Sequence, residues 1–67
     1  MTVTDLNNTS RLLAPREVAA WLGRSLPALS QMRYRGTGPV FIHAGGRVRY
    51  RVSDVEAWLT AGERSAT

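Results

Sequence analysis

The sequence contains no cysteine, no lysine and only one histidine, and these absences exclude several classes of function. Without cysteine there can be no disulfide, no thiolate zinc site and no cysteine nucleophile. The single histidine, His43, cannot build a multi-histidine metal site, and it leaves only one candidate base for a serine nucleophile. We therefore expect no enzymatic activity, no cofactor and no metal site.

Long apolar runs are also missing. No stretch approaches the ~20 apolar residues of a membrane span, and residues 1–10 lack the basic start and apolar centre of a signal peptide. The chain has 67 residues, of which 43% are hydrophobic and 21% charged, which suits one small globular domain. We expect a cytoplasmic protein without a membrane partner.

Acidic residues are absent between Glu17 and Asp54, although six of the nine arginines lie there. The arginine guanidinium suits phosphates and guanine edges, but a GC-rich coding sequence also replaces lysine by arginine. Positive charge gathered in one part of a chain is typical of a nucleic-acid-binding face. By itself it does not distinguish DNA from RNA or from an acidic protein.

A first helix is predicted over residues 15–22. Pro15 is favourable in a first helical turn, Gly23 is a favourable C-cap, and residues 12–13 lead into the helix. Its apolar stripe consists of Val18, Ala19, Trp21 and Leu22.

A second helix is predicted to begin after Ser25, which is a good N-cap, and to end at Gly36. Leu29 and Met32 define its inner side. On its outer side lie Pro27, Ser30, Gln31 and Tyr34, with Ala28 and Arg35 on one shoulder and Arg33 on the other, nearer the core. Two short helices joined by a tight turn favour a helix-turn-helix. This acid-free outer face suits a DNA groove better than an ordinary solvent face.

A β-hairpin is predicted around Gly45 and Gly46, which separate two β-rich runs over residues 40–44 and 47–52. In the second run arginine and apolar residues alternate: Arg47, Val48, Arg49, Tyr50, Arg51 and Val52. The alternation places the arginines on one face, where they could grip a DNA backbone or minor groove. The alternative is an edge strand protected by charge against aggregation.

A third helix is predicted from a capping box, Ser53 with Glu56, and Gly62 can end it. Its apolar face consists of Val55, Trp58 and Leu59. Trp21, Tyr50 and Trp58 are expected in the core, His43 partly buried, and Tyr34 exposed.

Four segments together resemble excisionase-type helix-turn-helix proteins. Residues 12–19 (LLAPREVA) are similar to the opening motif of that family, and residues 23–25 (GRS) to its turn. Residues 42–50 (IHAGGRVRY) are similar to its wing, and residues 53–59 (SDVEAWL) to its closing helix. The resemblance spans about residues 12–60, and the wing with the closing helix is its specific part.

The resemblance implies a small, mainly α, α+β fold: a MerR-like winged helix-turn-helix with a two-stranded wing. It places the second helix in the major groove, with these candidates for contact: Pro27, Ala28, Ser30, Gln31, Arg33, Tyr34 and Arg35. The wing and backbone candidates are Arg24, Gly45, Gly46, Arg47 and Arg49. We expect a flexible segment over residues 1–11, the domain over 12–61, and a frayed tail over 62–67.

Two positions depart from the family pattern. Ala14 stands where the first helix usually has a Thr or Ser cap, which weakens that N-terminus by about 1 kcal/mol. Residues 26–28 (LPA) replace a more polar start of the second helix, so base reading should depend on Gln31, Arg33 and Arg35, or on DNA shape.

The function that the resemblance implies is that of an excisionase, or recombination directionality factor, of a temperate bacteriophage. Such a protein binds attachment-site repeats in double-stranded DNA beside neighbouring copies of itself, bends the DNA, and directs integrase toward prophage excision. It would act in the bacterial cytoplasm, associated with the nucleoid. The alternatives are an AlpA-like or MerR-like transcriptional regulator and, in another class, a protein-interaction module that binds integrase.

Overall fold

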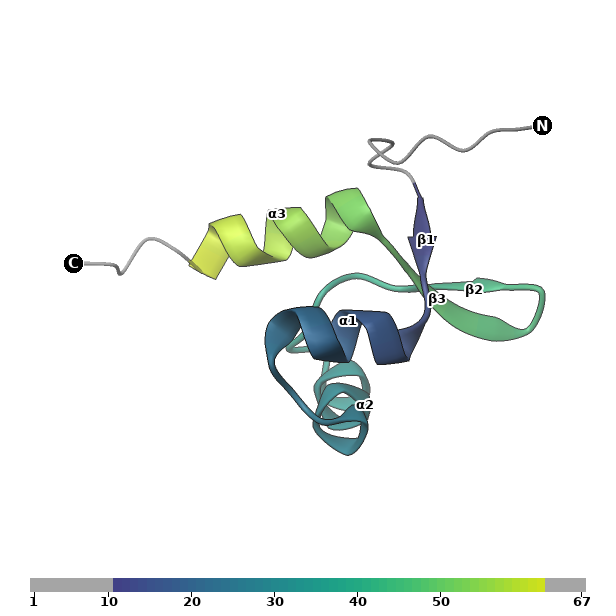
Figure 1. Cartoon of the computed structure of the whole chain (residues 1–67), viewed down its shortest axis with the longest axis horizontal. Helices are drawn as coiled ribbons and strands as arrows, with labels where there is room; N and C mark the ends of the chain where they lie inside the picture. Colours follow the sequence, from purple (N-terminus) through teal and green to yellow (C-terminus); the bar gives the residue numbers. More distant parts are fainter. Residues whose placement is uncertain (1–10, 63–67) are drawn as a thin grey trace.

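Three helices surround a small antiparallel sheet in the computed structural model, which describes residues 11–62. In chain order the elements are β1 (Leu12–Leu13), α1 (Pro15–Leu22), α2 (Leu26–Arg35), β2 (Ile42–Ala44), β3 (Arg47–Arg51) and α3 (Val52–Gly62). Strand β3 lies between β1 and β2. The hairpin of β2 and β3 and the helix α3 extend in opposite directions, with α1 and α2 on one side of them (Figure 1). The fold is a winged helix-turn-helix, as the sequence predicts.

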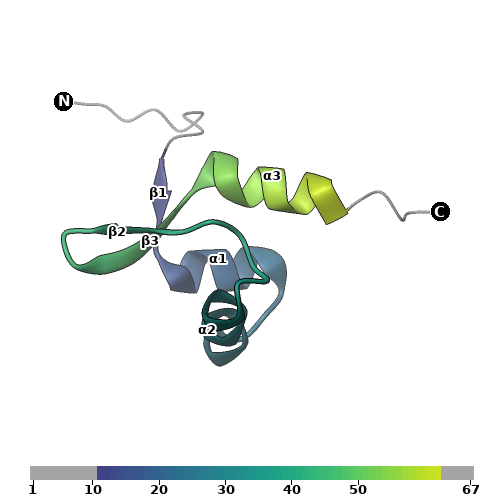
Figure 2. The same ribbon diagram turned by 180° about the vertical axis from the view of Figure 1, so that it is seen from behind.

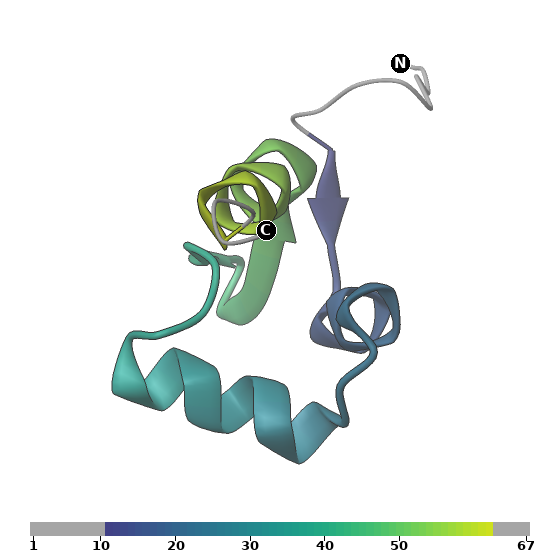
Figure 3. The same cartoon turned by 90° about the vertical axis from the view of Figure 1, so that its left-hand side faces the viewer.

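The helix-turn-helix has the boundaries and caps that the sequence predicts. Helix α1 ends at Gly23, whose φ of 69° is left-handed, and the next amide, of Arg24, donates to the carbonyl of Ala19 at 2.8 Å. The hydroxyl of Ser25 then caps α2 by accepting from the amide of Ala28 at 3.2 Å. In Figure 3 helix α2 runs across the view below α1, which is seen nearly end-on. The short turn therefore joins two helices that point in different directions.

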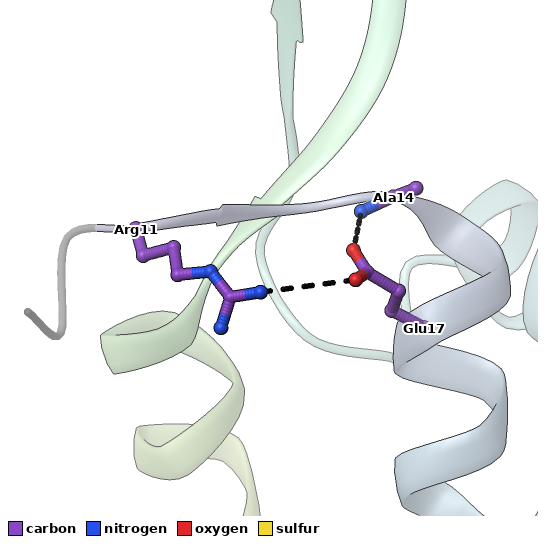
Figure 4. A network of polar contacts seen from close by, with 3 residues as sticks. All are labelled: Arg11, Ala14 and Glu17. Carbon is purple, nitrogen blue, oxygen red and sulfur yellow. Dashed lines mark hydrogen bonds and ion pairs between the residues drawn. The ribbon is translucent and has the colours of Figure 1, made fainter. Parts of the chain in front are cut away.

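The N-terminus of α1 lacks a side-chain cap, because Ala14 occupies the N-cap position. The opposite half of a capping box is present: the Glu17 carboxylate accepts from the amide of Ala14 at 2.9 Å. The same carboxylate lies 3.8 Å from the guanidinium of Arg11 (Figure 4). Glu17 therefore partly replaces the missing cap, and its charge also suits the N-terminal end of the helix dipole.

The hairpin of β2 and β3, called the wing from here on, forms around the glycine pair as predicted. Gly45 and Gly46 have φ of 61° and 81°, and Ala44 pairs with Arg47 on either side of them. Two successive positive φ values define the type I′ turn, whose twist matches that of paired strands. The register continues with His43 opposite Val48. The alternation ends one residue early, because Val52 begins α3 instead of continuing β3.

Strand β1 was not predicted from the sequence. Leu12 pairs with Arg51, and Leu13 pairs with Tyr50. The amide of Val52 also donates to the carbonyl of Arg11 at 3.0 Å. Two residues cannot show a period-two pattern, so the strand becomes recognisable only through its pairing partner. It makes β3 a central strand, with a neighbour on each side.

The capping box predicted at Ser53 is wrong. Helix α3 already includes Val52, so Ser53 is inside the helix and is not its N-cap. The chain passes from β3 into α3 without a connecting turn (Figure 1). At this junction Asp54 accepts a hydrogen bond from the guanidinium of Arg51 at 2.8 Å.

Most of the elements each contribute one or two buried residues to the core. Its buried members are Leu13, Val18, Ala19, Leu29, Tyr50 and Val55, and the hydrophobic residues packed against them are Leu22, Met32, Phe41, Val48, Val52 and Leu59. The burial of Tyr50 was predicted correctly. The prediction for His43 is wrong, because its side chain is exposed.

The two tryptophans differ, although both were predicted in the core. Trp21 is 43% exposed, because it lies to one side of the stripe that Val18 and Ala19 form on α1. Trp58 is half-buried, and its indole N–H donates to the carbonyl of Thr37 at 3.1 Å. This bond attaches α3 to the segment between α2 and β2, which runs beside α3 (Figure 2). The predicted terminal segments lie outside the described residues, except for Arg11 and Gly62.

We expect Trp58→Ala to lower the free energy of unfolding by about 3 kcal/mol, a large part of the stability of so small a domain. Trp58→Phe, which loses mainly the indole hydrogen bond, should lower it by about 1 kcal/mol. Trp21→Ala is the control, and its effect should stay below about 1 kcal/mol. Urea unfolding followed by circular dichroism measures all three. Equal effects of the two alanine substitutions would contradict the placement of the rings.

We expect Ala14→Ser to stabilise the domain by about 1 kcal/mol. Ala14 has φ −75° and ψ 156°, nearly the same as the working cap Ser25 with −79° and 161°. A serine hydroxyl at this position can therefore accept from the first turn of α1. Ser25→Ala should destabilise the domain by a similar amount. An Ala14→Ser protein that unfolds at the urea concentration of the parent would disprove this.

Candidate nucleic-acid interface

The outward face of α2 is exposed and carries no acidic group. Five of the seven predicted groove residues are exposed: Pro27, Ser30, Gln31, Tyr34 and Arg35. Tyr34 reaches 92% exposure, so its ring has no packing role in the domain. The helix lies along one outer edge of the molecule (Figure 3). Small residues, an amide and a guanidinium are therefore presented together on a helix that can approach another surface closely.

The other two predicted groove residues are turned toward the protein. Ala28 is half-buried in the first turn of α2. Arg33 is also half-buried, and its guanidinium donates to the hydroxyl of Tyr50 at 3.2 Å. The structure therefore separates Arg33 from the exposed set. The helical wheel had already placed it nearest the core, but the wheel could not identify its partner on a distant strand.

The arginines of the wing are not equivalent. Arg47, beside the exposed glycine tip, is exposed. Arg49 is half-buried, and its guanidinium donates to the carbonyl of Val48 at 2.7 Å. Arg51 lies at the base of the wing and is paired with Asp54. Of the three arginines on this strand, the two nearest the tip are therefore the ones available to an anionic ligand.

A shallow hollow joins the wing to the start of both helices of the helix-turn-helix. Its apolar lining comes from Ala14, Pro15 and Leu26, and its charged lining comes from Arg16, Glu17, Arg47 and Arg49. The hollow brings the wing arginines to the same side of the domain as the first residue of α2. Sequence reasoning missed Arg16, because nothing in the sequence relates position 16 to a wing that begins 26 residues later, at Ile42.

Positive charge predominates around this surface. Within residues 11–62 the acidic groups are Glu17, Asp54 and Glu56, and the first two form ion pairs with Arg11 and Arg51. The arginines that have no ion-pair partner in this part of the chain are Arg16, Arg24, Arg33, Arg35, Arg47 and Arg49. Asp54 and Glu56 both belong to α3. Glu17 belongs to α1, so none of the three acidic residues lies on α2.

The described residues contain no group of three or more His, Asp or Glu side chains close enough to hold a metal ion. None of the helices between residues 11 and 62 is long and apolar enough to cross a membrane.

A family model described as a helix-turn-helix domain matches residues 12–63 of the chain. The family contains small DNA-binding proteins of the excisionase and AlpA-like kinds. The match covers every element of the described fold, including the wing and α3. No curated protein matches the chain.

We expect Arg47→Ala to weaken binding to all duplex sequences alike. About five or six phosphate contacts give a slope near −5 in a plot of log affinity against log salt concentration, and removing one contact reduces its magnitude by about 1. Arg49→Ala should act in the same direction. Arg51→Ala is the matched control on the same strand, because Arg51 is already paired with Asp54. Fluorescence anisotropy at several salt concentrations measures the slopes. If the salt slope of Arg47→Ala equalled that of the parent, the tip of the wing would not be part of the DNA interface.

Proposed function

The chain belongs to a family of helix-turn-helix domains that bind DNA, and from this premise we propose that it is an excisionase. In this role it binds repeated sequences at an attachment site, bends the duplex and directs integrase toward excision of a prophage. It acts in the bacterial cytoplasm and has no catalysis of its own. The observation that carries the proposal is the hollow shared by Leu26, Arg47 and Arg49, because it allows one duplex to contact the recognition helix and the wing together.

Helix α2 is the element that reads sequence in this proposal. The major groove, about 12 Å wide, admits a helix whose outer side chains are short or can donate hydrogen bonds. Gln31 can form a bidentate contact with adenine, and Arg35 can bind guanine or a phosphate. Tyr34, at 92% exposure, can reach the sugar-phosphate backbone. The apolar start of α2 contributes close approach and few hydrogen bonds, so specificity depends on few residues.

The wing supplies affinity that is independent of sequence. Arg47 and Arg49 lie beside a tip without side chains, which can follow a narrow minor groove or the adjoining phosphates. Arg16, which lines the hollow with the wing arginines, and Arg24, in the turn between α1 and α2, are both exposed and supply further positive charge.

One domain of this size makes too few contacts for tight binding to a single site. If copies on adjacent repeats contact one another, each copy raises the effective concentration of its neighbour at the DNA. Binding is then tighter although each copy makes no new contact with the DNA. Such an array also offers a physical reason for bending, because each copy can deform the duplex where it inserts. A site made of direct repeats about one helical turn apart is the arrangement that this proposal requires.

A genomic binding selection followed by footprinting tests the proposal. Direct repeats beside an integrase attachment site would support an excisionase. Isolated or inverted sites at promoters would instead support an AlpA-like regulator, which the same family contains. Failure to bind any duplex at low salt would exclude both and leave a protein-interaction module.

We expect Gln31→Ala to change which sequences are preferred, with a loss of about 1–3 kcal/mol in discrimination at one base pair. The salt dependence should stay that of the parent, because an amide releases no counterion. Arg47→Ala is the contrasting variant, since it should weaken all sequences and leave the preference unchanged. A selection with Gln31→Ala that recovers the parental motif unchanged would show that this face does not read the DNA.

A further inference from the structure

We propose that Arg33 is a positioning residue, which holds the recognition helix α2 at a fixed orientation to the wing and does not itself contact DNA. The inference rests on the proposed function only in that α2 and the wing bind the same duplex. Its structural part, a connection between helix and sheet, holds for the free protein.

Three contacts hold the guanidinium of Arg33. One terminal nitrogen, Nη1, donates to the hydroxyl of Tyr50 at 3.2 Å, and the other, Nη2, lies 3.4 Å from the hydroxyl of Ser30. The Cζ atom lies 5.7 Å from the centre of the Phe41 ring, within the range of a cation–π interaction. The two nitrogens thus face in different directions, one toward the sheet and one toward the helix itself.

The partner on the sheet is the most deeply buried side chain of β3. Tyr50 is 1% exposed and belongs to the central strand, where it pairs with Leu13. Its ring lies 6.3 Å from that of Phe41, measured between centres, at an interplanar angle of 54°. A buried hydroxyl needs a hydrogen-bond partner, and Arg33 is the partner found here. Arg33 therefore attaches α2 to the buried centre of the domain, at the base of the wing.

Few other polar contacts fix the orientation of α2. Within residues 11–62, the Arg33–Tyr50 bond is the only hydrogen bond between α2 and the sheet. Leu29 and Met32 pack α2 against the core. Apolar packing has little directionality, so it opposes the separation of α2 from the core more strongly than the rotation of α2 on it. A directional bond near the C-terminal end of α2 thus complements the turn at its N-terminal end.

Arginine suits this position better than lysine would. Its planar group donates in two fixed directions and also stacks on an aromatic face. A lysine keeps the charge but offers a single flexible ammonium, which cannot hold Tyr50, Ser30 and Phe41 in one geometry. With its terminal nitrogens engaged by Tyr50 and Ser30, Arg33 has less capacity to bind a base than the exposed Arg35 on the same helix.

A change in the orientation of α2 should weaken DNA binding without removing a phosphate contact. The recognition helix and the wing must fit two neighbouring grooves together, so only molecules with the correct angle can bind. The apparent affinity is then reduced by the fraction of molecules that hold this angle. We expect a loss of about three- to ten-fold in affinity with an unchanged salt slope, which differs from the loss of a direct contact.

The first experiment measures the angle without DNA. The chain has no cysteine, so Gln31→Cys and Arg47→Cys introduce two spin labels, one on α2 and one on the wing. Tyr50→Phe removes only a hydroxyl, and Arg33→Met removes the guanidinium. Both should broaden the distance distribution between the labels in pulsed electron paramagnetic resonance. Arg35→Met, the control on the same helix, should leave it narrow. A distribution that stays narrow in Tyr50→Phe would overturn the proposal, even if Arg33→Met failed to fold.

The second experiment measures duplex affinity at several salt concentrations for the unlabelled proteins. Tyr50→Phe and Arg33→Met should lower affinity together at the parental slope, and Arg33→Lys should resemble Arg33→Met although it keeps the charge. A slope reduced by about 1 in Arg33→Met, with no effect of Tyr50→Phe, would make Arg33 a phosphate contact and overturn the proposal. If the parent bound no duplex, the proposed function would fail, whereas the spin-label distances would still decide whether Arg33 holds α2.

Discussion

The burial of Tyr50 on the central strand is the constraint on which the rest of this domain depends. Its backbone pairs with β1, its ring packs in the core beside Phe41, and its hydroxyl holds Arg33 of α2. With six buried hydrophobic residues between positions 11 and 62, few side chains can contact so many elements. Small domains bury a smaller fraction of their surface than large ones, so each buried ring contributes a larger share of their stability.

The arrangement of charge follows from the same strand. Alternation along β3 turns Tyr50 inward and its two arginine neighbours away from the core. One of these, Arg51, is neutralised by Asp54 at the point where α3 begins, whereas Arg49 stays near the wing tip. The fold thus keeps its acidic helix on one end of β3 and its available arginines on the other. Strand β3 therefore supplies the central core residue and also keeps the available arginines apart from the acidic helix.

Most of the fold could be predicted from the sequence because its signals are local. The glycines at 23 and 36, the serine cap at 25 and the glycine pair of the wing each act through their own backbone. Two of the misses depend on partners distant in sequence: strand β1 exists only by pairing with β3, and Arg33 faces inward because of Tyr50. The start of α3 was missed because this helix follows directly on the last residue of β3.

The positive φ values at the tip of the wing limit how this protein can diversify. Around Gly45 and Gly46 there is open space for a side chain, so the restriction comes from the backbone alone. Residues with a β-carbon rarely adopt this conformation, apart from asparagine and aspartate. The tip therefore cannot readily acquire a large side chain that discriminates between bases. Under the proposed function, recognition of a different DNA site would therefore have to come from changes outside the tip, above all on the exposed face of α2.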